Sequence, residues 1–162
     1  MKSLSIVLLT LLVGGCTVNK NTSTMHPFTG HEIGCGNFIV FKLSEDNTEY
    51  VSVAFNASEV EWEDFQGYSL EKAQIAKVER KKYRSPIHTT LCNDVMTDRP
   101  EQLLSDVAIS GTLEILANDI EREKAKEDQG YRVTIILKDV FFENSSIDYL
   151  RIDNVYVGWL PG

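Results

Sequence analysis

Two short stretches of the sequence place a histidine four residues before a cysteine. HEIGC runs from His31 to Cys35 and HTTLC from His88 to Cys92, in a chain with only three histidines and three cysteines. A spacing of four puts both side chains of a pair on the same side of a helix or a strand. Two such pairs supply the ligands of a tetrahedral Cys₂His₂ zinc site. The same two cysteines can instead form a disulfide, and the cellular compartment decides between the two.

The first residues, MKSLSIVLLTLLVGGC, have the layout of a secretory signal. Lys2 precedes the mainly apolar run Leu4–Val13, which is too short to span a membrane permanently. The run Leu12-Val13-Gly14-Gly15-Cys16 resembles the lipobox of bacterial lipoproteins, in which aliphatic and small residues precede an invariant cysteine. This resemblance implies that residues 1–15 are cleaved and that diacylglycerol and a further acyl chain are attached to the new terminus at Cys16.

Several acyl chains together anchor a protein stably, whereas one alone binds a membrane only marginally. We therefore expect a lipid-anchored protein of the bacterial cell envelope, with the lipid bilayer as a partner. The residue after Cys16 is Thr17 rather than Asp, which in enterobacterial lipoproteins favours the outer membrane. Residues 16–32 are read as the lipidated terminus and a polar tether, and residues 33–162 as one domain.

Composition limits the classes of partner. The chain has 24 acidic and 16 basic residues, a formal net charge of −8, so an acidic surface argues against nucleic acid. Its 43% of hydrophobic residues is typical of a globular protein. No cofactor is predicted.

The compartment makes a disulfide the favoured reading of the two cysteine motifs. Once Cys16 is assigned to lipid, an even pair of cysteines remains in an oxidising environment. The bond Cys35–Cys92 would close a loop of 57 residues (92 less 35) and contribute about 4 kcal/mol in the chain-entropy model. A zinc site of His31, Cys35, His88 and Cys92 stays the alternative.

Two further metal hypotheses come from side chains near these motifs. His26, His31 and Glu32 form one set, but His26 lies in the predicted tether, where ligands are not preorganised. The acidic run Glu59, Glu61, Glu63 and Asp64 offers oxygen ligands for calcium. It lacks EF-hand spacing, and alternating acids are typical of a solvated face.

Segments rich in β-branched and aromatic residues predict a mainly β domain. Asn37–Leu43 and Glu49–Phe55 are joined by SEDNT and predict a hairpin, with Val51 and Val53 on one face. Ser58–Phe65 is read as a short helix capped by Ser58 or as an irregular strand. Glu71–Tyr83 is read as a strand, and the segment through Pro86 and Pro100 as a loop that carries Cys92.

The C-terminal third has the clearest pattern. Ser110–Leu116 and Tyr131–Phe142 predict strands, and the charged stretch NDIEREKAKEDQG between them predicts a hairpin tip or a short solvated helix. Ser146–Leu160 supplies a further strand or two. Several short strands with turn signals between them favour an antiparallel β-sandwich or a barrel-like domain with at most one or two short helices. The sequence pattern SGTLEIL…YRVTIILKDVFFEN resembles that of β-rich lipoproteins of the bacterial envelope. This resemblance implies no known activity.

Aromatic and basic residues supply the remaining binding candidates. The aromatics Trp62, Tyr149, Tyr156 and Trp159 are candidates for a sugar or lipid platform, although aromatics in β domains are mostly core residues. The basic run Lys77–Arg84 is read as balancing local acidic charge.

The sequence contains no nucleophile elbow, phosphate-binding loop, H-E-x-x-H or C-x-x-C motif. We therefore assign no catalytic residue and do not predict that the protein is an enzyme. We expect a membrane-anchored envelope lipoprotein with a non-catalytic binding or scaffolding role toward a protein or glycan partner. The alternative is a lipocalin-like β-barrel that carries a small apolar ligand. An apolar cavity inside a closed barrel would favour the carrier, and a filled interior would favour the interaction module.

Overall fold

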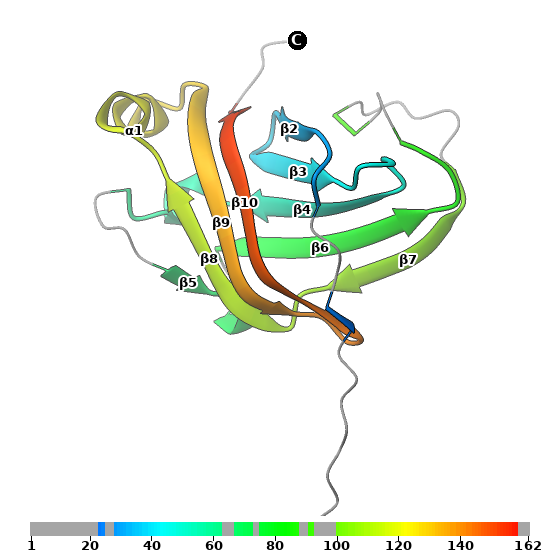
Figure 1. Ribbon diagram of the computed structural model, residues 1–162. Coiled ribbons are helices and arrows are strands. Elements are labelled where there is room, and N and C mark those ends of the chain that lie inside the picture. Colours follow the sequence, from blue (N-terminus) through cyan, green and yellow to red (C-terminus); the bar gives the residue numbers. More distant parts are fainter. Residues whose placement is uncertain are drawn as a thin grey trace, which may run out of the picture.

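The computed structural model describes residues 23–24, 28–62, 67–72, 75–87, 91–92 and 100–158. Its strands form two five-stranded sheets packed face to face (Figure 1). Sheet A has the order β1-β10-β9-β8-β5 and consists of β1 (Ser23–Thr24), β5 (Gly67–Ser69), β8 (Ser110–Leu116), β9 (Tyr131–Phe141) and β10 (Ser145–Val157). Sheet B has the order β2-β3-β4-β6-β7 and consists of β2 (Glu32–Cys35), β3 (Ile39–Leu43), β4 (Glu49–Phe55), β6 (Ala76–Tyr83) and β7 (Gln102–Val107). All neighbouring strands are antiparallel except the short pair β1–β10. The predicted β-sandwich is confirmed, and the described strands do not close into a barrel.

The strands of the two sheets cross at a steep angle. In Figure 1, β8, β9 and β10 run across the direction of β3, β4 and β6, as in orthogonally packed sheets. The chain passes from sheet B to sheet A directly after β7, where the Ile109 amide donates a 2.9 Å hydrogen bond to the Phe141 carbonyl. At another edge β2 lies against β10, and Gly34 is required there because a Cβ atom would stand 1.8 Å from the Tyr156 carbonyl oxygen.

Alternating side chains build the core between the sheets. The two-residue period predicts that Tyr131, Val133, Ile135 and Leu137 share one face of β9, and all four are buried. From the facing strand β4, Val51 and Val53 are fully buried in the same cluster. On the opposite face Arg132 is exposed and Thr134 and Lys138 are half-buried, whereas Ile136 is buried.

Local chemistry explains the predicted β3–β4 hairpin. The Asp46 carboxylate accepts hydrogen bonds from the Thr48 amide (3.1 Å) and from the Ser44 hydroxyl (2.7 Å), while Asn47 takes a left-handed φ of 56°. These bonds, with the Ser44 hydroxyl the largest contributor, lower the pKa of Asp46. The turn residues therefore set the register of the two strands.

The charged stretch after β8 forms helix α1 (Asp119–Lys126), the solvated-helix form of the prediction. Asn118 caps it by accepting a 2.9 Å hydrogen bond from the Glu121 amide, acids lie in its first turn, and Lys124 and Lys126 lie in its last turn. Only Ala125 of this helix is buried.

Two expectations for the middle of the chain need correction. The single turn of 3₁₀ helix η1 (Ala57–Glu59) is capped by Asn56, which accepts from the Ser58 amide, and not by Ser58 itself. Glu71–Tyr83 begins with a second 3₁₀ turn, η2 (Leu70–Lys72), and becomes the strand β6 only from Ala76.

Strand β7 was not predicted, because its sequence QLLSDV lacks a strict two-residue hydrophobic period. It is an edge strand in which Leu103 and Val107 are about half exposed.

The expected tether contributes more to the domain than its polar sequence indicates. Strand β1 pairs Ser23 with Ser145 and Thr24 with Ser146, and Phe28 is buried in the core between the sheets. Structure therefore begins before the expected boundary at residue 33. Cys16 and the rest of the leader and tether, up to residue 22, lie outside the described residues.

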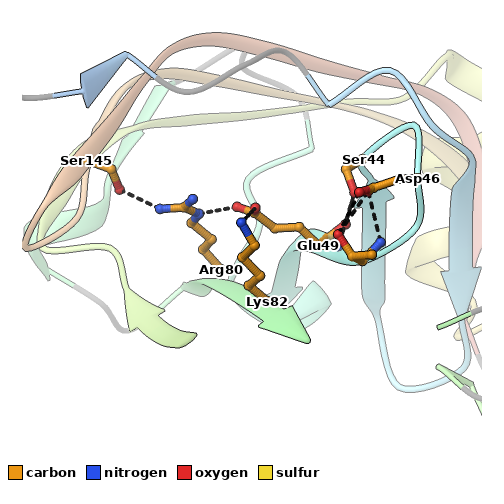
Figure 2. A network of polar contacts seen from close by, with 7 residues as sticks. Ser44, Asp46, Glu49, Arg80, Lys82 and Ser145 are labelled. Carbon is orange, nitrogen blue, oxygen red and sulfur yellow. Dashed lines mark hydrogen bonds and ion pairs between the residues drawn. The ribbon is translucent and has the colours of Figure 1, made fainter. Parts of the chain in front are cut away.

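A polar network joins the two sheets at the end where β9 turns into β10 (Figure 2). Arg80 of β6 forms an ion pair with Glu49 of β4 and donates a 3.0 Å hydrogen bond to the Ser145 hydroxyl of sheet A. Lys82 lies 3.9 Å from the same Glu49 carboxylate. The inward side chains at this end of β6 are thus paired polar groups, in contrast to the apolar Ala76 and Val78 at the other end.

Candidate functional site: a pocket on the outer face of sheet B

Sheet B has a pocket of about 210 Å³ on the face directed away from sheet A. Most of its lining residues are aliphatic or aromatic, while its surface is polar and apolar in similar shares. The lining residues are Ile39, Phe41, Tyr50, Ser52, Ala54, Glu79, Lys81, Tyr83, Ile87, Leu91 and Pro100.

Strand alternation forms the floor of the pocket. Because Val51 and Val53 of β4 point into the core, Tyr50, Ser52 and Ala54 point to the opposite face. Aromatic side chains pack around this floor, with the Phe41 and Tyr50 ring centroids 5.2 Å apart in an edge-on contact and Tyr83 stacked on Tyr50 at 6.0 Å. This second cluster is separate from the core between the sheets.

Ile87, Leu91 and Pro100, which follow β6 in the chain, form the roof of the pocket. The Ile87 amide donates a 2.8 Å hydrogen bond to the Asn47 carbonyl in the β3–β4 turn. Cys92, next to Leu91, forms a disulfide with Cys35 of β2, with a Cα–Cα distance of 5.3 Å. These two bonds hold the roof residues Ile87 and Leu91 to the sheet.

Charged side chains of β6 form one end of the pocket. The Glu79 carboxylate pairs with Lys77 at 2.5 Å and with Lys81 at 3.3 Å. Burial acts to raise the pKa of Glu79, but the hydrogen bonds and charges of the two lysines outweigh it and lower that pKa. The two lysines therefore stabilise the ionised form of this carboxylate.

The cysteine motifs form the predicted disulfide, Cys35–Cys92, which takes both sulfurs away from the zinc alternative. His31 is exposed, and His26 and His88 lie outside the described residues. Among the residues that the structure describes, no group of three or more His, Cys, Asp or Glu side chains is placed to hold a metal ion. Glu59 and Glu61 are exposed, while Glu63 and Asp64 of the calcium hypothesis also fall outside the described part.

The three described aromatics of the proposed platform do not share one surface. Trp62 packs edge-on against Tyr131 at 5.1 Å, on the core side of sheet A. Tyr149 and Tyr156 lie exposed on the outer face of β10, and Trp159 is outside the described residues.

The basic run is divided between the two faces of β6. Lys77 and Lys81 lie on the pocket side, whereas Arg80 and Lys82 point toward Glu49 on the core side. This division follows from the two-residue period of a strand. Local charge balance was expected and is seen in both ion-pair groups.

Sequence reasoning did not find the pocket. The residues that could have indicated it are Phe41, Tyr50 and Tyr83, which alternate with core residues and give sheet B a second apolar face. This second apolar face can be recognised only when the strand order is known.

No protein-family model, curated protein or solved structure matches this chain. Within the described ranges, the structure contains no helix that is both long and apolar enough to cross a membrane.

Proposed function

We propose that this chain is a lipoprotein of the bacterial envelope, anchored through acylated Cys16, whose β domain binds another envelope component without catalysing a reaction. The leader and its lipobox support the anchor. The preformed pocket on sheet B carries the binding role, because a roof held by a disulfide and a backbone hydrogen bond costs little further ordering when a ligand enters. The bound group comes from a protein or glycan partner or from a small molecule of the envelope.

The filled interior supports this reading over the lipocalin-like carrier. A carrier needs an apolar cavity inside a closed barrel. Here Val53, Leu113, Ile135, Leu137 and Ile152 are fully buried in the space between two open sheets. The pocket lies outside that interior, on the other face of sheet B.

The anchor is tested by expressing the full chain and a Cys16→Ala variant in a bacterium that processes lipoproteins. We expect the purified chain to lack residues 1–15, to carry the mass of a diacylglycerol and an acyl chain, and to fractionate with the outer membrane. The variant should lose the lipid mass and the membrane association. A protein that retains unmodified Met1 would contradict the anchor.

The binding role is tested by filling the pocket. Ala54→Leu adds three carbon atoms to its floor, and Ser69→Leu is the matched control, because Ser69 is an exposed residue of β5 in sheet A, outside the pocket lining. Envelope components that co-purify with the lipidated wild-type chain should be lost from Ala54→Leu and kept by Ser69→Leu. Equal recovery with all three proteins would show that the pocket is not the binding site.

A further inference from the structure

The pocket face of sheet B has an excess of positive charge in a chain whose net charge is −8. Lys77, Glu79 and Lys81 are the charged side chains that β6 directs to this face, two cations for one carboxylate. On the described strands β3, β4 and β7, the outward residues are all uncharged. These residues are Ile39, Phe41 and Leu43 on β3, Tyr50, Ser52 and Ala54 on β4, and Leu103, Ser105 and Val107 on β7. Both lysines contact Glu79, so among the described residues of this face the cations exceed the carboxylates by one.

A serine hydroxyl lies beside these charges. Ser52 lines the pocket, is 6% exposed, and its hydroxyl makes no hydrogen bond within the described part of the chain. It stands directly across from Glu79 in the β4–β6 register, which makes Lys81 a diagonal neighbour on the same face. A hydroxyl that faces the pocket without a protein partner can hydrogen-bond a ligand in place of water.

The volume of the pocket limits the size of the apolar part of a ligand. An engineered apolar cavity of about 150 Å³ holds one benzene molecule. A pocket of 210 Å³ therefore admits one aromatic ring or a short branched aliphatic chain with a small polar group. The long acyl chain of a lipid does not fit.

We propose that the pocket binds a small apolar monocarboxylate, whose ring or aliphatic chain lies between Ala54 and Leu91 while its carboxylate accepts hydrogen bonds from the Lys81 ammonium and the Ser52 hydroxyl. This inference rests on the proposed function, because it names the ligand class of the same pocket. Two sources share this chemistry, namely a free aromatic or branched aliphatic acid and the C-terminal apolar residue of a peptide.

The test uses the full lipidated chain in nanodiscs and three probes followed by ¹⁹F NMR. The probes are 3-(4-fluorophenyl)propionate, the corresponding neutral alcohol 3-(4-fluorophenyl)propanol, and the tripeptide Gly-Gly-(4-fluoro-Phe) with a free or an amidated C-terminus. Empty nanodiscs measure partition into lipid. We expect the propionate to bind about 10-fold more tightly than the alcohol, as a charge-assisted hydrogen bond requires.

Three variants separate the charge at the pocket from charge elsewhere. Lys81→Gln should remove the preference for the propionate. Lys82→Gln removes the same charge one residue away on the other face and should keep that preference. Glu79→Gln releases both lysines and should tighten propionate binding several-fold, and the alcohol should bind all variants equally. Thermal melts establish that each variant is folded.

Each outcome bears on one proposal. Equal binding of propionate and alcohol, or equal losses in Lys81→Gln and Lys82→Gln, would overturn the carboxylate inference and leave the pocket as a binding site. Absence of binding by every probe to folded wild-type protein would overturn this inference, while the anchor and the Ala54→Leu co-purification test of the proposed function stand apart from it. Tighter binding of the free-carboxylate tripeptide than of the propionate would assign the source to a peptide terminus, and weaker binding would assign it to a free acid.

Discussion

Arg80 joins the two sheets through a 3.0 Å hydrogen bond from its Nη1 atom to the hydroxyl of Ser145 (Figure 2). The two residues are 65 positions apart in the chain. Glu49 balances the guanidinium charge from the neighbouring strand, and both charged side chains are less than one fifth exposed. A cation in this position needs both partners, because water does not replace them there.

Glu49→Gln should lower the free energy of unfolding by about 2 kcal/mol, since it leaves a largely buried guanidinium without its counter-charge. Urea unfolding of Glu49→Gln, Arg80→Met and the double variant gives the coupling energy of the pair. The Arg84–Glu101 pair is the matched control, because its side chains are 67% and 60% exposed. Its double-mutant cycle should give a coupling energy of less than about 1 kcal/mol. Equal coupling in the two cycles would show that burial of Arg80 has no energetic consequence.

Tyr131→Phe should leave stability unchanged or raise it by up to about 1 kcal/mol. The Tyr131 hydroxyl is buried and has no hydrogen-bond partner among the described residues, and burial, followed by the charge of Asp128, raises the pKa of this phenol. Phenylalanine keeps the edge-on contact with Trp62 and removes the unpaired polar atom. Chemical denaturation measures the difference, and a loss above 1 kcal/mol would indicate a partner outside the described residues.

Replacing both disulfide cysteines, Cys35→Ser with Cys92→Ser, should lower the free energy of unfolding by about 4 kcal/mol. The same variant should weaken ligand binding at the pocket, because Leu91 next to Cys92 is no longer held over the sheet. Thiol titration of denatured, non-reduced wild-type protein should find neither Cys35 nor Cys92 reactive. Two reactive thiols at these positions would restore the zinc alternative.

The Glu79 carboxylate should make stability depend on pH in the acid range. Its pKa in the folded protein is below its ordinary value of 4.5, so the ionised form stabilises the fold. This contribution is fully present above about pH 4.5 and is lost as the pH falls through the lower, folded-state pKa. The difference in unfolding free energy between wild type and Glu79→Gln should therefore be constant from neutral pH to about pH 5 and decrease below it. A difference that grows on acidification would reverse the assigned direction of the shift.

Local patterns in the sequence determined most of the strands. The turn chemistry of Ser44 and Asp46 and the two-residue period of Tyr131–Leu137 depend on neighbours along the chain, so they predicted a hairpin and a buried strand face without knowledge of the rest. The disulfide also followed from the sequence, because its prediction needed a compartment and a count of cysteines and no geometry. Strand β7 was missed, since its apolar residues do not alternate.

The tertiary structure alone decided where the chemistry lies. The two-residue period of a strand separates the adjacent Lys81 and Lys82, but only the tertiary structure shows that Lys81 lies at the pocket and Lys82 faces Glu49 on the core side. The sequence predicted that Val51 and Val53 share one face of β4, and only the strand order and the disulfide revealed that the opposite face, around Tyr50 and Ser52, is also buried. The physical reason is that the outward face of a strand is solvated or buried according to segments distant in the chain, and a local pattern holds no information about them.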